Sequence, residues 1–326
     1  MHIKAKFQII GLVFLTLPLA CSGQDLGEIT SYTVFKTANY HQTNGTPPLA
    51  LDAPDAYFFG VQYFADSTNL ITNGVTFITP DDVTYSIPAT NESFVAYNSD
   101  YFTAKAGMDA AFPDGLYLFS INQDTNYSDL TLPTNELYAS AIPAYSGETW
   151  TNLQSLDPGQ PLTLNWNDFT PNAAATSAFV FIRILDVEAN KFVWSESFLP
   201  PATTTTLLPA ATLNYGDYYR IELLFSTRSD VQNAGFGGAE ATGGFDNLTY
   251  TYFTTIPLLL NIAPEGTNVV LSWTNSATNY FLQCTHDLAT GNWNYLTNQR
   301  FVSGNQLVVT NGVGTQNTFF RLQTSP

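Results

Sequence analysis

The chain has 326 residues, of which 44% are hydrophobic and only 11% are charged, and its formal net charge is −17. Phosphate backbones and anionic lipid headgroups are bound by clustered Lys and Arg, so this charge balance excludes nucleic acid as a partner. Two cysteines in the whole chain also exclude a fold held together by several disulfides.

The N-terminal segment, residues 1–23, is predicted to be a signal peptide. Lys4 and Lys6 precede an apolar stretch from Phe7 to Ala20, and small residues follow it. An apolar run of about 14 residues is too short to cross a bilayer, which needs about 20. No later stretch is longer, so we expect an exported protein with no transmembrane segment in its mature form.

Cys21 offers a second interpretation of the same segment. Leu19-Ala20-Cys21 resembles the end of a bacterial lipoprotein signal, in which the Cys carries a lipid that anchors the protein to a membrane. Pro18 stands where such signals have Leu or a similar aliphatic residue, and ordinary cleavage one or two residues later is the alternative. Both alternatives place the protein outside the cytoplasm, either extracellular or on the outer cell surface.

Without residues 1–23 the chain keeps eight Lys and Arg against 27 acids, a net charge of about −19, and one cysteine, Cys284. A single thiol forms no internal disulfide, and Cys284 is expected to be a small, buried apolar side chain. No cofactor is expected. Calcium is a weaker alternative, because the stretches from Thr79 to Asp82 and from Asp109 to Asp114 contain acids but lack the regular spacing of calcium loops.

Composition and periodicity predict an all-β fold of tandem β-sandwich modules, of the immunoglobulin or fibronectin III type. Short alternating runs are cut by Pro, Gly and Asn-Gly roughly every 8 to 12 residues. Val75 to Thr79, Gly115 to Ile121 and Ala178 to Leu185 are examples, and no amphipathic helix longer than about two turns is expected. We expect three modules after the signal peptide, at residues 24–156, 157–256 and 257–326.

The first module is rich in paired aromatic residues such as Tyr57-Phe58-Phe59 and Tyr101-Phe102. Rings at every second position are typical of a sandwich core, but exposed flat rings also stack on the faces of sugars. Trp150, in the loop-like stretch from Ser146 to Thr151, is the candidate carbohydrate-binding residue.

In the second module, Leu162, Leu164 and Trp166 alternate onto one face of a predicted strand, and a second strand motif runs from Leu213 to Leu223. Together they resemble a fibronectin type III domain, which has an early core Trp and a late Tyr whose hydroxyl bonds back to the turn before it. The resemblance implies that Trp166 and Tyr219 are core residues.

The same resemblance extends to the residues around the late Tyr. Leu213, Gly216, Ile221 and Leu223 match the pattern of the family, whereas Tyr215 departs from its usual Pro. The domain type implies interaction more than catalysis, although a fold alone assigns no function.

The Gly-rich stretch from Gly235 to Asn247 is the most unusual part of this module. It has two interpretations: a flexible site that presents Glu240 and Asp246 to a ligand, or a long loop between the last two strands. A phosphate-binding loop would need a Lys and a following helix, which are missing. We predict the loop.

The third module repeats the alternating pattern at Val269, Leu271 and Trp273, and it adds a turn that contains Trp293. With the closing Phe319 to Leu322, it resembles a small C-terminal β-module of large exported bacterial proteins. The resemblance implies surface attachment or an export-related role, and it places Trp273 and Trp293 in the core.

The sequence offers little chemistry for catalysis. Beyond the signal peptide it has two histidines, His41 and His286, and no metal ligand set is expected. A Cys284 and His286 pair lacks an oriented base and an oxyanion pocket. A glycosidase needs only two carboxylates, so the acids leave that possibility open.

The sequence therefore predicts a non-enzymatic exported or cell-surface protein for adhesion or other extracellular interaction. A carbohydrate-binding protein that recognises polysaccharide is the main alternative, and an accessory or degenerate hydrolase is a weaker one. The expected partner is a protein or polysaccharide at the cell surface, bound at loops or exposed strand edges.

Overall fold

The computed structural model describes residues 29–46, 51–65, 74–88, 94–121, 128–235 and 239–324. Strands dominate these ranges, and the helices in them are α1 (Lys105–Ala111) and α2 (Gly147–Leu153), of seven residues each. The predicted all-β class is confirmed. The predicted signal peptide and Cys21 lie outside the described residues. Neither described helix is long and apolar enough to cross a membrane.

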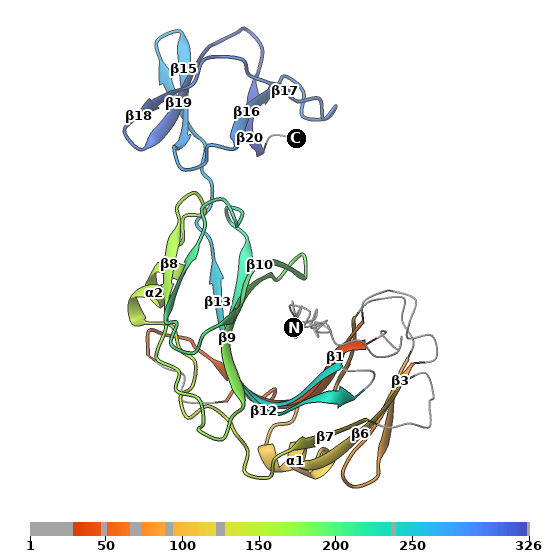
Figure 1. Ribbon diagram of the computed structural model, residues 1–326. Helices are drawn as coiled ribbons and strands as arrows, with labels where there is room; N and C mark the ends of the chain where they lie inside the picture. The colour runs from red at the N-terminus through yellow and green to blue at the C-terminus, as the bar shows by residue number, and fades with distance from the viewer. Residues whose placement is uncertain are drawn as a thin grey trace.

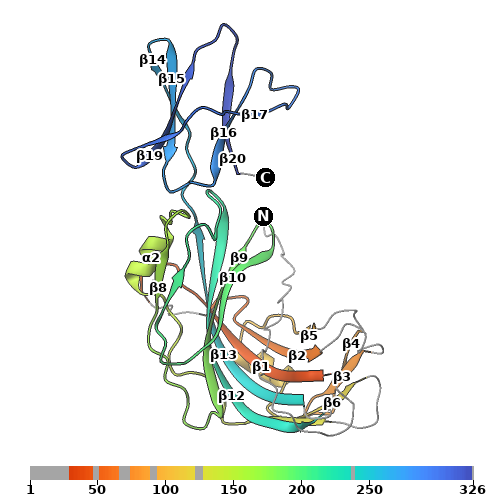
Figure 2. The same ribbon diagram turned by 45° about the horizontal axis from the view of Figure 1, so that its top comes forward.

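A bent seven-stranded sheet forms the centre of the molecule (Figures 1 and 2). In spatial order its strands are β10 (Lys191–Leu199), β9 (Ser177–Asp186), β12 (Tyr218–Gly235), β13 (Ala239–Thr254), β1 (Ile29–His41), β2 (Tyr57–Ala65) and β5 (Phe94–Asn98). The central pair, β1 and β13, is parallel, and all other neighbours are antiparallel. Strands from both sides of residue 156 thus share one sheet.

Two smaller sheets cover the outer side of the bend. The first contains β4 (Thr84–Ile87), β3 (Val75–Ile78), β6 (Gly115–Ile121) and β7 (Ser128–Leu132), and the second contains β11 (Thr205–Leu208) and β8 (Leu162–Asn165). Figure 1 shows α1, β6 and β7 beneath one half of the large sheet and α2 with β8 against the other half. The two largest apolar cores lie between these layers, one around Phe59 and Phe77 and one around Trp166 and Phe225.

Lys36 is fully buried beside the first of these cores. Its Nζ lies 2.8 Å from Oδ1 of Asp109 and 2.7 Å from Oδ1 of Asp114. Asp109 belongs to α1, so the stretch that was weighed as a calcium loop is a short helix and a turn whose acids neutralise a buried cation. Among the described residues, no group of three or more His, Cys, Asp or Glu is placed to hold a metal.

The C-terminal residues form a separate lobe of two small sheets, seen at the top of Figures 1 and 2. One sheet contains β14 (Asn261–Glu265), β15 (Asn268–Thr274), β19 (Gln306–Gly312) and β18 (Phe301–Ser303), and the other contains β17 (Asn294–Tyr295), β16 (Tyr280–Thr285) and β20 (Phe319–Thr324). Leu271 and Trp273 fill the core between them, as the alternating pattern requires.

Two residues of this lobe lie elsewhere than expected. Trp293 is half-buried outside the core, because it lies in the irregular chain before β17, where the Arg321 guanidinium covers its ring at 4.3 Å. Cys284, expected to be buried, is half-buried on β16, which with β17 and β20 forms a sheet of only three strands.

Asp157 joins this lobe to the rest of the molecule. Its two carboxylate oxygens accept hydrogen bonds from the hydroxyls of Tyr215 and Ser276, both at 2.8 Å. The Tyr215 ring also meets the edge of Tyr280 at 5.7 Å. One carboxylate thus bonds to both sides of the junction.

Candidate functional site

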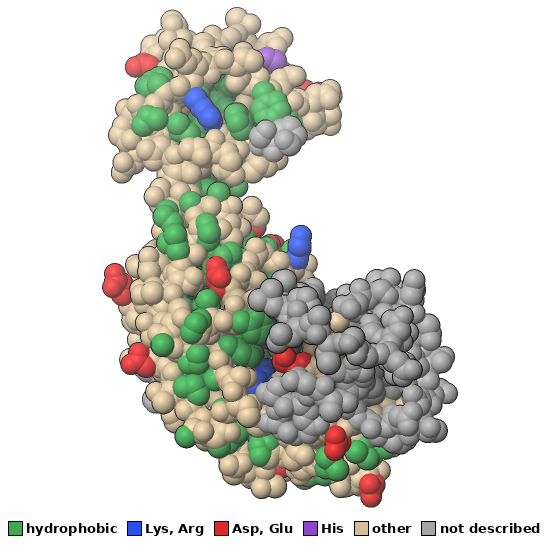
Figure 3. Space-filling model, in the orientation of Figure 1, with side chains coloured by type: hydrophobic (Ala, Val, Ile, Leu, Met, Phe, Trp, Pro, Cys, Tyr) green, Lys and Arg blue, Asp and Glu red, His purple; other side chains and the backbone are tan. Residues whose placement is uncertain are grey.

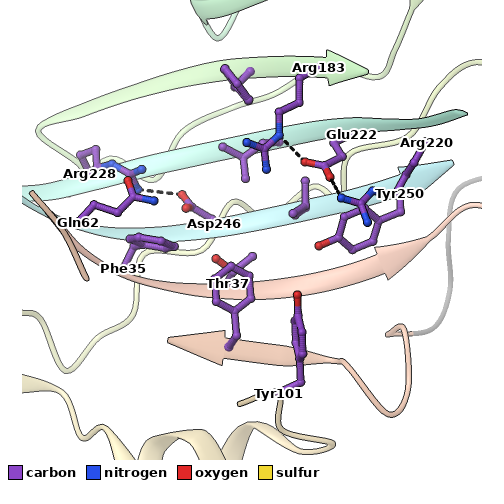
Figure 4. Close-up of a pocket in the computed structure, with 14 residues that line it drawn as sticks. Phe35, Thr37, Gln62, Tyr101, Arg183, Arg220, Glu222, Arg228, Asp246 and Tyr250 are labelled. Carbon is purple, nitrogen blue, oxygen red and sulfur yellow. Dashed lines mark hydrogen bonds and ion pairs between the residues drawn. The ribbon is translucent and has the colours of Figure 1, made fainter. Parts of the chain in front are cut away.

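The inner side of the bent sheet contains a hollow that encloses about 620 Å³ of space free of protein atoms, part of it open to solvent (Figure 4). Its lining comes from β1, β2, β9, β12 and β13, together with one residue between β5 and α1. The lining residues are Phe35, Thr37, Phe58, Gln62, Tyr101, Phe181, Arg183, Arg220, Glu222, Leu224, Arg228, Asp246, Leu248 and Tyr250.

Strand alternation explains why charged side chains occur here in strands that are otherwise apolar. Successive side chains of β12 point to opposite faces, so Ile221, Leu223 and Phe225 enter the outer core while Glu222 and Arg220 face the hollow. A curved sheet that is packed on one side leaves its other side available for polar groups.

Two glycines shape the floor of the hollow. Across the sheet, Gly60 pairs with Phe35, Phe35 with Gly244, and Gly244 with Arg228. A Cβ atom on Gly60 would lie 2.3 Å from the Phe35 ring, and one on Gly244 would lie 2.0 Å from Nη1 of Arg228. The missing side chains therefore allow the ring and the guanidinium to lie against the backbone of the sheet.

The next set of cross-strand neighbours, two residues further along each strand, places polar side chains beside aromatic ones. Phe58 pairs with Thr37, Thr37 with Asp246, and Asp246 with Ser226. The hydroxyl oxygens of Thr37 and Ser226 are buried and have no hydrogen-bond partner. Each unpaired buried polar group costs about 1–3 kcal/mol. This set therefore has unused hydrogen-bonding capacity.

Arg228 extends this polar region by two residues along β12. Its Nη1 donates to Oδ1 of Asp246 at 2.8 Å, and its side chain is 94% buried. Its Nε is buried and has no hydrogen-bond partner. Because a guanidinium only donates hydrogen bonds, an acceptor oxygen in the hollow would complete its bonding.

A second ionic group occupies the other end of the hollow. The buried Glu222 carboxylate binds Arg183, whose Nε lies 2.5 Å from Oε2, and also Arg220 (Figure 4). Burial alone would raise the pKa of Glu222, but the two neighbouring guanidinium charges outweigh this effect and hold its pKa below the ordinary value. Glu222 is therefore ionised at neutral pH.

Aromatic rings form the apolar part of the lining. The Phe35 and Phe58 rings meet edge to face at 5.8 Å, and Phe58 meets Tyr101 at 5.7 Å. Burial raises the pKa of Tyr101 to about 12, so its hydroxyl stays protonated at neutral pH. The guanidinium of Arg220 lies 4.9 Å from the centre of the Tyr250 ring. The hollow thus combines flat apolar surfaces with buried hydrogen-bonding groups.

The structure places the candidate carbohydrate-binding Trp150 away from this hollow. The stretch predicted to be a loop forms α2, on the outer side of the sheet, and Ser146 caps that helix by accepting a hydrogen bond from the backbone N–H of Thr149. Trp150 is half-buried and its Nε1 has no hydrogen-bond partner.

The prediction of a long loop from Gly235 to Asn247 is wrong for the described residues from Ala239 onward. Ala239–Thr254 form β13, which pairs with β12 on one side and β1 on the other. A glycine on this strand makes room for Arg228, so Gly244 serves close packing rather than flexibility. Asp246 lies in the hollow, whereas Glu240 is not among its lining residues.

The sequence predicts two core residues in the second module, Trp166 and Tyr219. Trp166 and Tyr219 are both buried in the outer core. The Tyr219 hydroxyl accepts a hydrogen bond from the backbone N–H of Asn214 at 3.0 Å, which is the bond of a tyrosine corner.

The residues of the hollow were not recognised in the sequence, although it contained a signal. Arg183 interrupts the apolar run from Ala178 to Leu185, and Arg220 and Glu222 interrupt the run around Tyr219. Charged residues are seldom buried unless they are paired. Opposite charges within two predicted core strands therefore indicate a polar site on one face of a sheet.

The sequence matches no known protein family and no curated protein. Solved structures to which the chain is similar include the FN1–FN3 domains of chicken CNTN1, at 8% identity and a TM-score of 0.24, with 81% of this chain and 88% of that one covered. Another is the BSP domain of a biofilm-associated protein, at 11% identity and a TM-score of 0.20, where the match covers 70% of this chain and 30% of the other.

A third is a tetra-tandem repeat from the extending region of a large adhesion protein, at 11% identity and a TM-score of 0.22, with 90% of this chain and 66% of that one covered.

Proposed function

We propose that this chain is an exported, non-enzymatic protein that acts in extracellular interaction, and that it recognises polysaccharide in the hollow on the inner side of its large sheet. One observation supports this most: the Phe35, Phe58 and Tyr101 rings lie beside buried polar atoms that have no partner in the protein. A sugar presents apolar ring faces and hydroxyl groups close together, and so complements both features.

Adhesion through loops or sheet edges, the first expectation from the sequence, is compatible with this proposal. A polysaccharide at a cell surface is itself an adhesion target. The hollow adds a specific place for the contact, on rigid strands rather than on loops.

A degenerate hydrolase is a poorer account of the same residues. A glycosidase needs one carboxylic acid that is protonated at working pH, and this requires a raised pKa. Glu222 has its pKa lowered by two arginines, and Asp246 is paired with Arg228. Both lining carboxylates are engaged by guanidinium groups, which disfavours the role of general acid.

Export through the signal peptide, lipidation of Cys21 and surface attachment through the C-terminal lobe are parts of the same proposal. Mass spectrometry of the protein recovered from bacterial culture tests the first two, because it reports both the cleavage site and any added lipid. The modular boundary at residue 256 is also a proposal, which limited proteolysis would test.

A screen of the full chain on a glycan array, followed by pull-down on insoluble polysaccharides, tests the recognition itself. Tyr101→Ala removes a half-buried ring from the hollow, and Tyr295→Ala, whose side chain is 43% exposed in the C-terminal lobe, is the matched control. We expect binding that Tyr101→Ala weakens at least tenfold and Tyr295→Ala leaves unchanged. Binding lost in Trp150→Ala instead would move the site to α2, and no binding to any polysaccharide would refute the proposal.

Figure 3 shows one face of the molecule, on which apolar and uncharged surface is available for contact. The described surface in that view is mostly uncharged, with sparse acidic and basic side chains.

A further inference from the structure

The hollow gathers a large share of the chain's positive charge. Three of the five arginines in the sequence, Arg183, Arg220 and Arg228, line it, whereas its lining includes only the acids Glu222 and Asp246. The chain as a whole has a net charge of −17. The hollow is thus locally cationic on an acidic protein.

The unused hydrogen-bonding groups of the hollow are mostly donors. Nε of Arg228, on β12, and the hydroxyl of Thr37, on β1, belong to lining residues and are buried without partners, on the two strands that flank Asp246. Arg228 and Thr37 are only 5% and 1% exposed as whole residues. Such donors are costly to bury, and a ligand that supplies acceptor oxygens would offset that cost.

Asp246 accepts none of these donors. Its Oδ1 binds Nη1 of Arg228, while Nε of the same guanidinium remains without a partner. At the other end of the hollow, Asp52 lies within electrostatic reach of Arg220 without lining the cavity. The unmet need for acceptors is therefore concentrated at Arg228 and Thr37.

From this geometry we infer that the ligand is an acidic polysaccharide whose sugar carboxylate binds at Arg228 and Thr37. A carboxylate has two oxygens and about four lone-pair sites, so it satisfies several donors at once. The rest of the sugar ring would lie against Phe35 and Phe58. This inference rests on the proposed function and specifies its ligand class.

The experiment compares two polymers that differ in the carboxylate alone. Sodium polygalacturonate and the same polymer after chemical reduction of its carboxyl groups are titrated into the full chain by calorimetry. The titrations are done at 0.15 M salt, where charges more than about 8 Å apart are largely screened. We expect the acidic polymer to bind at least tenfold more tightly.

A matched pair of variants tests the residue assignment. Thr37→Val and Thr251→Val each remove a buried hydroxyl that has no partner, but Thr251 is not among the residues that line the hollow. Removing one hydrogen bond to a charged group is expected to weaken polygalacturonate binding about tenfold in Thr37→Val. Thr251→Val should bind as the unmodified chain does. Both variants keep the shape of the side chain, and their melting temperatures report whether they fold.

The outcomes separate this inference from the proposed function. The requirement for a carboxylate would be overturned if the acidic and reduced polymers bound equally well, or if only other neutral polysaccharides bound and their binding depended on Tyr101. Either result would leave polysaccharide recognition intact. Equally tight binding of polyglutamate, an acidic chain without sugar rings, would overturn the claim that the ligand must contain sugar rings. Binding that Thr251→Val weakens as much as Thr37→Val would overturn the assignment to Thr37. No binding of any polysaccharide would overturn both proposals.

Discussion

Replacement of Glu222 by Gln is expected to destabilise the protein strongly. Glu222 is 1% exposed, and it binds two guanidinium groups, those of Arg183 and Arg220, whose side chains are only 10% and 5% exposed. The neutral amide preserves the shape of the side chain but removes the negative charge that lies between the two buried guanidinium groups. The structure therefore predicts a large effect from a change of one charge.

The magnitude follows from the burial of all three groups. Removing one partner of a buried ion pair costs about 3–5 kcal/mol, because the remaining charge loses its compensation. The Gln carbonyl still accepts one hydrogen bond, so we expect the lower end of this range, about 3 kcal/mol. A domain is stable by only about 5–15 kcal/mol in total, so the variant should unfold at clearly lower denaturant concentration.

Urea unfolding followed by tryptophan fluorescence measures this loss, with Glu188→Gln as the control, because Glu188 is an exposed carboxylate next to β9. The control should change the free energy of unfolding by less than about 0.5 kcal/mol. A loss below about 1 kcal/mol in Glu222→Gln would show that the two arginines are hydrated, and the picture of a buried ionic group would then be incorrect.

Three further results are expected. The folded-state pKa of Glu222 lies below its ordinary value of 4.5, so the stability from its ionised form is present above about pH 4.5 and is lost as the pH falls through the folded-state pKa. Thermal melts between pH 3 and 7 should show this decline in stability, and the Glu222→Gln variant should show a smaller decline. Gly244→Ala should lower the melting temperature, because the added Cβ would lie 2.0 Å from Nη1 of Arg228. Gly107→Ala is the control and should not lower it, because its Cβ would meet only a ring atom at 3.5 Å. Equal melting temperatures of the two variants would contradict the close packing at Gly244. Asp157→Ala should let the C-terminal lobe move relative to the rest of the molecule. We expect faster proteolysis near residue 256 and a broader distance distribution in small-angle scattering. If neither measurement changes, the hydrogen bonds of Asp157 to its two hydroxyl partners do not hold the junction.

Strand positions could be predicted from the sequence wherever one face of a strand is buried. Leu162, Leu164 and Trp166 lie on one side of their strand, and Val269, Leu271 and Trp273 do the same in the C-terminal lobe. The alternating pattern requires this, because successive side chains point to opposite faces.

The central sheet could not be predicted in the same way. The parallel pairing of β1 with β13 joins Thr33 to Thr242, which are 209 residues apart in the sequence. Local patterns carry no information about such partners, and they also led to separate modules for strands that share a sheet. The Gly-rich stretch was predicted to be a loop because glycine usually interrupts strands, whereas Gly244 is needed here for close approach of Arg228.

The site was hidden for a related reason. Its lining comes mainly from five strands that are scattered along the chain, and each of them contributes only two to four residues to the hollow. Trp150 was predicted to bind carbohydrate because Trp stacks well on sugars. The residue lies in α2, and the N-cap of that helix, Ser146, was interpreted as part of a loop.

Photo-affinity labelling tests the central claim most directly. A diazirine-bearing oligosaccharide of the class selected by the array is bound to the full chain, activated by light, and mapped by peptide mass spectrometry. Our account predicts labels on residues of β1, β12 and β13 that line the hollow, and their loss when unlabelled polymer competes. Competable labels confined to α2 or to the C-terminal lobe would contradict it.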